Sequence, residues 1–489
     1  MISKAPDAKI QSSAVASSIA VAGAVVTTLA SFLVAILVSQ ESKGFAGAFF
    51  TSTAVATIFG NALALGTPTA LVYFMPQALE GATPSPRGLV LQTLRPVVVL
   101  SCLAAIAVFF LAVPFADLVA DERSDEILTL VRAFSPAIPA WAVTASLLGA
   151  TRGLGSMSPT VVVSQVMRPG GQILLLGALF LRGSPTPLQI GLAWMFPVVI
   201  AMLAAALAVE RLGGFSGAAP SAVSSAEFWT FARPRSLANA LQIALERIDV
   251  IFVQALLGAD AAGVYGALTR YIAAGNFLIF AVAQAVSVTL RRAIASVDFG
   301  LAGDILRQTT AWLVLAAWPY FLIVALKPEP LADILNSEFV SDAGILSILA
   351  IGMMVSAAAG PIDLTLLMLG KSKLSLAGVA VAIVTDISLL FILAPRYGLA
   401  GAAIAWALSV VAQNLLASYF VHRHSGLTTP SKAWFTAAAI ALLAAVPVSL
   451  VTPNTFVGLA IAGLVAGAIL VGAVLANRST FFAASIKPG

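Results

Sequence analysis

Charged side chains within otherwise apolar stretches are the residues of this chain that could do chemistry. A charge at the centre of a bilayer costs at least about 2.5–3.5 kcal/mol on insertion scales, so each one requires a binding, coupling or structural role. Three arginines and four carboxylates fall in such stretches: Arg168, Glu246, Arg247, Asp249, Arg270, Asp363 and Asp386. Asp386 stands alone and is the least informative of them.

Arg168 is the deepest cation in the first half of the chain. It stands about ten residues into its apolar stretch, which in a helix is about 15 Å. The following Pro169-Gly170-Gly171 predicts a helix break that frees backbone carbonyls. Since the neighbouring stretches hold no acidic residue at depth, we interpret Arg168 as a ligand for an anion, whose oxygens a guanidinium engages in pairs. The alternative is a structural arginine held by the freed carbonyls.

Two further arginines, Arg270 and Arg247, complete the predicted anion-binding set of a central cavity. Asp249 and Arg270 stand at similar distances from a predicted tight turn, so we expect them at matching depth in adjacent helices. An ion pair between them would either connect the two helices or belong to the substrate site.

Carboxylates near these arginines are candidates for ion coupling. Glu246 and Asp249 are three residues apart and so share a helix face, and Asp363 follows a second predicted break at Gly360-Pro361. For each of these carboxylates, structural pairing is the alternative role. The chain has no D-x-D motif and no histidine-based dyad, so we expect no catalytic residue, no metal site and no cofactor.

The composition defines the elements that must position these charges. Of 489 residues, 60% are apolar and only 10% are charged. Soluble domains are about 45–50% apolar and about 25% charged, so this composition excludes a soluble enzyme and predicts an all-α polytopic membrane protein. Fourteen stretches are long enough to cross a bilayer: 13–39, 46–76, 89–116, 128–151, 159–181, 187–209, 236–258, 263–290, 308–326, 345–369, 374–394, 399–421, 433–451 and 455–476.

The distribution of basic residues predicts the orientation. With fourteen spans both termini share one side, and if that side is cytoplasmic, 17 of the 26 basic residues lie inside and 6 outside. This bias favours cytoplasmic N- and C-termini. Because the basic residues are dispersed among short loops, the net charge of +5 does not indicate a nucleic-acid partner.

Two sequence echoes indicate an internal repeat. Glu41-Ser-Lys-Gly44-Phe-Ala-Gly47-Ala48 matches Asp260-Ala-Ala-Gly263-Val-Tyr-Gly266-Ala267, and Gly191-Leu-Ala-Trp194 matches Ala403-Ile-Ala-Trp406. Both echoes relate one span to the sixth span after it, which predicts two six-helix lobes related by a pseudo-two-fold axis along the membrane normal. We therefore expect an N-lobe at 1–209, a cytoplasmic linker at 210–235, a C-lobe at 236–424, and two appended helices with the C-terminal tail at 425–489.

Two motifs resemble those of polysaccharide and oligosaccharide flippases of the multidrug/oligosaccharidyl-lipid/polysaccharide exporter superfamily. The first is Leu245-Glu-Arg-Ile-Asp249 with Leu257-Gly-Ala-Asp-Ala-Ala-Gly263-Val-Tyr265 and Arg270. The second is Pro395-Arg-Tyr-Gly398-Leu-Ala-Gly401-Ala-Ala-Ile-Ala405. The resemblance implies a flippase of the bacterial cytoplasmic membrane that moves undecaprenyl-pyrophosphate-linked saccharides by alternating access. It also implies membrane lipid as a partner, with a polysaccharide polymerase and glycosyltransferases of the same pathway.

Other functions remain as alternatives with different residue requirements. A cation antiporter needs acidic residues in the first lobe, which has none at depth. A lipid II flippase is expected to carry basic residues in its first two spans, where this chain has no intramembrane charge. A membrane glycosyltransferase, polymerase or ligase needs a sizeable catalytic loop, and no loop here is long enough for a folded domain.

Overall fold

The computed structural model is built of helices joined by short connections. It describes residues 23, 25–80, 85–119, 124–217 and 223–476, and these contain no β-strand. The early part of the predicted first span and the C-terminal tail lie outside the described residues. A shorter apolar helix, Val25–Ser39, precedes the labelled helices. Those are α2 Lys43–Ala62, α3 Thr67–Glu80, α4 Pro86–Val119, α5 Ser124–Phe134, α6 Ala137–Gly153, the π-helix η1 Thr160–Met167, α7 Arg168–Arg182, α8 Pro187–Arg211, α9 Ser225–Leu257, α10 Ala259–Ala295, α11 Phe299–Leu326, α12 Pro328–Leu335, the 3₁₀-helix η2 Ser337–Asp342, α13 Ile345–Ala359, α14 Ile362–Met368, α15 Ser372–Ser425, α16 Lys432–Val451 and α17 Phe456–Ala476.

Many of these helices could span a membrane. Within the described residues, eight helices are long and apolar enough to cross a bilayer, and the bent pair α13–α14 makes a ninth candidate. Every predicted span, as far as it is described, is helical, but the helices over 159–181, 236–258 and 263–290 are not among these candidates. The predicted all-α polytopic membrane fold is therefore confirmed. The orientation of the termini stays a prediction.

Proline and glycine set the breaks within the predicted spans. The 54-residue α15 covers two predicted spans, and it leaves helical geometry at Gly398, with φ 58° and ψ −139°. A positive φ is accessible to glycine at little cost, so this residue makes the turn that the sequence predicted around it. Gly360, with φ 79°, ends α13 in the same way before the predicted break at Pro361.

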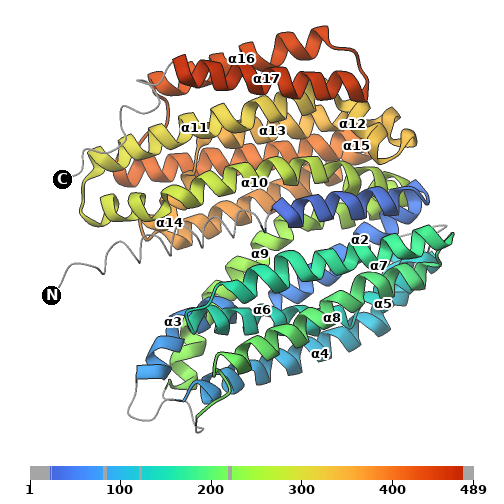
Figure 1. The fold of residues 1–489 in the computed structure, drawn as a ribbon, viewed down its shortest axis with the longest axis vertical. Helices are drawn as coiled ribbons and strands as arrows, with labels where there is room; N and C mark the ends of the chain where they lie inside the picture. The colour runs from blue at the N-terminus through green and yellow to red at the C-terminus, as the bar shows by residue number, and fades with distance from the viewer. Residues whose placement is uncertain (1–22, 24, 81–84, 120–123, 218–222, 477–489) are drawn as a thin grey trace. The chain divides into compact units, whose positions relative to one another are not determined.

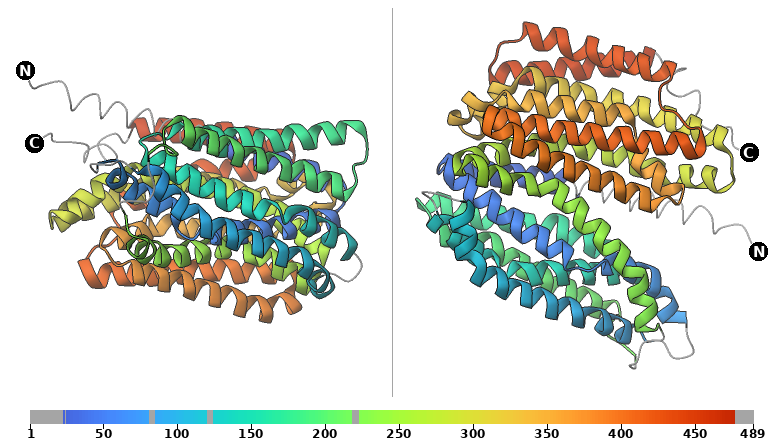
Figure 2. Two further views of the ribbon diagram at one scale, coloured as in Figure 1. Left: turned by 90° about the horizontal axis from the view of Figure 1, so that it is seen from below. Right: turned by 180° about the vertical axis from the view of Figure 1, so that it is seen from behind.

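The chain divides into two compact units, residues 1–263 and 264–489. In the first unit, α6 packs against α3, α4 and α8, and α9 packs along α2 and α3 (Figures 1 and 2). A buried cluster that includes Phe74, Met75, Leu89 and Phe228 fills the space between these helices. In the second unit, α11 lies against α13 and α16, and α16 also contacts α17 (Figure 1).

The helix α9 begins eleven residues before the seventh predicted span. Ser224 caps its N-terminus, with the hydroxyl accepting a hydrogen bond from the Glu227 amide at 3.2 Å. Phe228 is fully buried, and Phe231 stacks on Tyr73 with ring centroids 4.6 Å apart. Aromatic burial thus makes the second half of the expected 210–235 connection helical.

The two echo segments of the predicted repeat meet at their glycines within the first unit. A side chain at Gly47 would collide with the carbonyl of Ala259, and one at Gly263 would collide with the carbonyl of Lys43. The two helices α2 and α10 therefore approach backbone to backbone at this point. Glycine at both positions is a packing requirement, because any Cβ would separate the helices.

Candidate functional site

One face of α6 forms the first wall of a polar cavity. Trp141, Thr144, Ala145, Leu148 and Arg152 stand at positions i, i+3, i+4, i+7 and i+11, so they lie along one stripe of the helix. The opposite face of α6 is buried among α3, α4 and α8, which fixes the orientation of this stripe. The stripe carries polar side chains at both ends, with Trp141 and Thr144 at one end and Arg152 at the other.

The π-helix η1 and the start of α7 form the second wall. Pro169 has no amide hydrogen and its ring displaces the carbonyl four residues earlier, that of Gln165. The freed Gln165 carbonyl accepts a hydrogen bond from the Thr27 hydroxyl at 3.2 Å. The Arg168 amide instead bonds to the Val163 carbonyl, five residues back, so the chain widens into a π-helix. The predicted break around Pro169 is therefore present, and it turns Arg168 into the cavity.

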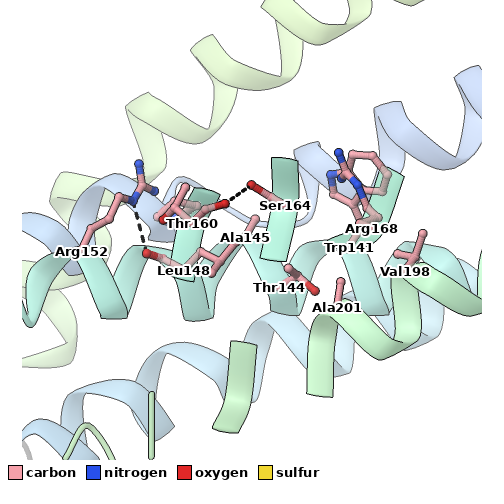
Figure 3. A pocket seen from close by; sticks show the side chains of 11 residues that line it. Trp141, Thr144, Ala145, Leu148, Arg152, Thr160, Ser164, Arg168, Val198 and Ala201 are labelled. Carbon is pink, nitrogen blue, oxygen red and sulfur yellow. Dashed lines mark hydrogen bonds between the residues drawn. The ribbon is translucent and has the colours of Figure 1, made fainter. Parts of the chain in front are cut away.

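Between these walls lies a cavity of about 190 Å³. Pro68 at the start of α3 and two residues of α8, Val198 and Ala201, complete its lining. Figure 3 shows Arg152 towards one end of the cavity and Arg168 with Trp141 towards the other, with Thr160 and Ser164 between them. All of these residues belong to the first unit.

The Arg168 guanidinium rests on an aromatic ring instead of on a carboxylate. Its central carbon lies 4.2 Å from the centroid of the Trp141 ring, and Trp141 in turn stacks with Trp194 at 6.4 Å and 16°. Among the described residues, Arg168 has no ion pair. A cation–π contact holds the charge in place without using its N–H groups, so these donors remain available to a ligand.

Arg152 is a second cation of the same cavity, and sequence reasoning missed it. Its Nε donates to the Leu148 carbonyl at 3.2 Å, and no carboxylate among the described residues pairs with it. The residue directly follows the predicted span 128–151, so the predicted orientation counts it among the basic residues of the cytoplasmic side. Its spacing of eleven residues from Trp141, three helical turns, was the available signal.

The hydroxyl groups of the cavity contribute acceptors more than donors. Thr144 donates to the Ala140 carbonyl at 2.6 Å and Ser164 to the Thr160 carbonyl at 2.5 Å (Figure 3 shows the second bond). The buried Thr160 hydroxyl has no hydrogen-bond partner within the described residues. The available donors are therefore two guanidinium groups and one hydroxyl, a set that suits an oxygen-rich anion.

The other predicted residues lie elsewhere. On α9, Glu246 is exposed and accepts from the Gln242 amide at 3.4 Å, Arg247 is half-buried, and Asp249 is only 4% exposed. One Asp249 oxygen accepts the Val250 amide hydrogen at 2.8 Å. The predicted shared face therefore presents its two carboxylates to different surroundings.

The predicted residues of the second unit are held by local contacts. The Arg270 Nε donates to the Gly266 carbonyl at 3.0 Å. Asp363 stands in the first turn of α14, beyond the break at Gly360, and accepts from the Ser375 hydroxyl at 2.7 Å. Neither residue lines the cavity of Arg168. The pairing of Asp249 with Arg270 and the coupling role of Asp363 stay predictions.

Solved structures of membrane transporters match this fold, whereas no protein-family model and no curated protein matches the sequence. The lipid II flippase MurJ in an inward closed conformation has a TM-score of 0.75 at 12% identity, over 94% of this chain and 98% of that one. An inward-facing multidrug resistance MATE family transporter of the MOP superfamily has a TM-score of 0.64 at 15% identity, over 82% and 94%. A MOP superfamily transporter from Pyrococcus furiosus, described by the reverse polarity of its binding pocket, has a TM-score of 0.60 at 15% identity, over 84% and 94%.

These matches establish the fold and leave the substrate to be argued from the site. Their fold is the one expected from the motif resemblance. The solved structures are a lipid II flippase and MATE transporters, and so do not extend that agreement to polysaccharide flippases. The chain has the fold of the MOP superfamily transporters.

Proposed function

We propose that this protein is a flippase that moves a lipid-linked saccharide, joined to its lipid through pyrophosphate, across the bacterial cytoplasmic membrane. The observation that carries the proposal is the cavity with two arginines, Arg152 and Arg168, and no carboxylate partner for either among the described residues. An uncompensated cation in a membrane protein is costly unless a ligand balances it. A pyrophosphate brings the negative charge and the acceptor oxygens that this set lacks.

The size of the cavity supports a role in binding the anion and not the whole glycan. A volume of about 190 Å³ accommodates a phosphate or pyrophosphate group, whereas an oligosaccharide needs more room. The glycan would occupy other space during transport. The walls come from α3, α6, η1 with α7, and α8 of one unit, and their packing would give the anion a rigid binding surface.

The polarity of the cavity argues against an antiporter for cations. Such a transporter needs carboxylates where this chain has Arg152 and Arg168. No group of three or more metal-type ligands occurs among the described residues, so no cation cluster replaces them. Anion binding is the chemistry that the lining supports.

Lipid II translocation is the second candidate function. It is favoured by the match to MurJ, which covers 94% of this chain against 82–86% for the MATE structures. The described residues of the first two predicted spans, 13–39 and 46–76, hold no cation, and Lys43 lies between these spans at the start of α2. If lipid II is the substrate, this chain binds its pyrophosphate with arginines of α6 and α7.

Alternating access is the mechanism we propose for the transport. Transporters with this fold have been solved in inward-facing and outward-facing conformations. A fixed anion site exposed in turn to each side would allow the polar head of the substrate to cross while its lipid stays in the bilayer.

Reconstitution of the purified protein into liposomes tests the proposal. Saccharides linked through pyrophosphate to undecaprenol are placed in the inner leaflet, and their appearance outside is followed with a membrane-impermeant enzyme that modifies the glycan. We expect translocation by the natural protein, and a loss of at least about tenfold for Arg168→Gln and Arg152→Gln, since each removes a charged hydrogen-bond donor.

Arg182→Gln is the matched control. Arg182 ends the same helix α7 but is exposed and does not line the cavity. We expect it to transport normally. Full activity of Arg168→Gln, or an equal loss in Arg182→Gln, would contradict an anion site in this cavity. Parallel assays with lipid II and with a polysaccharide repeat unit distinguish the two candidate substrates.

A further inference from the structure

A second cavity of about 580 Å³ lies between α2, α4 and α9 of the first unit. It forms beside the break between α2 and α3, where Leu65 and Gly66 have φ values of 54° and 70°. A side chain at Gly66 would collide with the Ala232 carbonyl of α9, so the backbone at this break lies directly against that helix. The chain turns here, and the space beside α9 is left open as far as Pro96 of α4.

The lining of this cavity is apolar except at one end. Trp229, Arg233, Leu237 and Ala240 recur at steps of three or four residues along α9. Arg233 and Ser236 are the polar members, whereas the residues from α2 and α4 are Ala62, Leu65, Pro96 and Leu100. The cavity therefore has a cation towards the start of α9 and an apolar wall further along it.

The mouth of this cavity is lined by exposed apolar side chains, which suits a lipid chain. Leu100, in the candidate span Pro86–Val119, is 43% exposed, and Leu237 is 54% exposed. Arg233 stands eight residues after the start of α9, about 12 Å along the helix, and Ala240 lies about 10 Å deeper. This is the arrangement of a lipid in a leaflet, with a charged head near the surface and a chain directed inwards.

The charge of Arg233 is not balanced by any carboxylate that the structure describes. No carboxylate among the described residues pairs with it. The nearby Arg235 differs, because its guanidinium rests 4.1 Å from the centroid of the Phe231 ring and does not line the cavity. One unpaired cation beside an apolar cavity is complementary to a single phosphate with an attached hydrocarbon chain.

We propose that this cavity binds an anionic phospholipid, with its phosphate on Arg233 and an acyl chain between α4 and α9. A phospholipid fits better than the lipid-linked substrate, because the cavity offers one cation where a pyrophosphate would engage two. It is also separate from the cavity of Arg152 and Arg168, with which it shares no lining residue. The proposal does not depend on the transport function.

Lipid binding to the detergent-purified protein, read by native mass spectrometry, tests this site. Phosphatidylglycerol and phosphatidylethanolamine with identical acyl chains are added at equal concentration. We expect the natural protein to retain phosphatidylglycerol preferentially and Arg233→Gln to reduce that retention at least about fivefold, since one basic residue near a membrane surface contributes about 1 kcal/mol to anionic lipid binding. Arg235→Gln, two residues further on, should retain the lipid as the natural protein does.

A second variant tests the apolar part. Leu237→Trp fills the cavity without changing its charge, and we expect it to weaken retention of both lipids. Equal retention of the two lipids by the natural protein would overturn the proposal. So would an equal loss in Arg235→Gln, or unchanged retention in Leu237→Trp. Displacement of phosphatidylglycerol by equimolar undecaprenyl phosphate would also overturn it, by assigning the cavity to the path of the transported lipid.

Discussion

Two cations, Lys327 in the second unit and Arg168 in the first, are held by different kinds of contact. Lys327, between α11 and α12, is 3% exposed, and its Nζ donates to the Thr452 carbonyl at 2.5 Å and to the Asn454 side-chain oxygen at 2.9 Å. Asn454 in turn donates to Glu329 at 3.2 Å. Arg168 has the face of Trp141 as its contact and no carboxylate among the described residues.

This difference separates a charge that stabilises the fold from a charge that is available to bind a ligand. Lys327 joins the end of α11 to the turn between α16 and α17, and its hydrogen bonds go to oxygens that the fold supplies. Arg168 is positioned by stacking, which constrains the guanidinium while leaving its donors for another molecule. A substitution at the first residue should therefore affect stability, and one at the second should affect transport.

Giving Arg168 an internal carboxylate should have the largest effect. Ser164 lines the same cavity four residues earlier, and Glu followed by Arg at this spacing is the favoured order for a helical ion pair. In Ser164→Glu the new carboxylate occupies the guanidinium and repels an anion. We expect substrate binding to weaken by about 2 kcal/mol, roughly thirtyfold, with thermal stability retained. The measurement is binding of pyrophosphate-linked saccharide to purified protein.

Ser164→Gln is the control, because it has the size of glutamate without its charge. It should keep most of the binding that Ser164→Glu loses. Equal loss in both variants would mean that the cavity cannot accept a longer side chain, and would remove the electrostatic argument.

Lys327→Met should mainly lower stability. It removes two hydrogen bonds from a charged donor and leaves the Thr452 carbonyl and the Asn454 oxygen without that donor, at a cost of about 2 kcal/mol. We expect a fall of a few degrees in the melting temperature of the detergent-purified protein, followed by tryptophan fluorescence at a fixed heating rate. Transport per folded molecule should be unchanged. A normal melting temperature with lost transport would reverse the distinction between the two cations.

The fold and one half of the site could be predicted from the sequence. Composition and apolar length predict a polytopic helical protein, because continuous apolar runs of about 20 residues suit helices, which satisfy their own backbone groups in a bilayer. Arg168 could be identified because a charge in a long apolar stretch is rare, and the break after it because Pro169 cannot donate an amide hydrogen. Each of these inferences depends on local chemistry.

The rest depends on tertiary packing. Arg152 resembles a loop cation in sequence, and its role emerges only when α6 continues to Gly153 and carries it onto the stripe of Trp141. Similarly, the repeat predicted equivalent glycines at Gly47 and Gly266, whereas Gly47 lies against the backbone around Gly263. A repeated sequence indicates which segments are equivalent, but it does not indicate which of their residues contact each other.

Removing the aromatic support of Arg168 should have an intermediate effect on binding. Trp141→Leu keeps an apolar side chain but loses the cation–π contact, which contributes about 0.5–2 kcal/mol. We expect a several-fold weaker apparent affinity for the substrate, with the charge still present. Trp312→Leu, at a tryptophan of the second unit remote from this cavity in the chain, controls for the general loss of a large ring. Unchanged affinity in Trp141→Leu would show that other contacts position the guanidinium.

Exchanging the guanidinium for an ammonium should have the smallest effect. Arg168→Lys retains the positive charge but has three donors on one nitrogen in place of a planar fork, so it cannot bind two oxygens of a phosphate side by side. Lysine also stacks less well on Trp141. We expect affinity to fall only a few-fold, and transport in liposomes to continue at a reduced rate, in contrast to Arg168→Gln. The same pair of variants should hardly differ in melting temperature, since the described residues supply no fixed oxygen that either side chain must satisfy. If lysine were as inactive as glutamine, the fork geometry would be required for transport. If glutamine were as active as lysine, the charge at this position would serve the fold, as it does at Lys327.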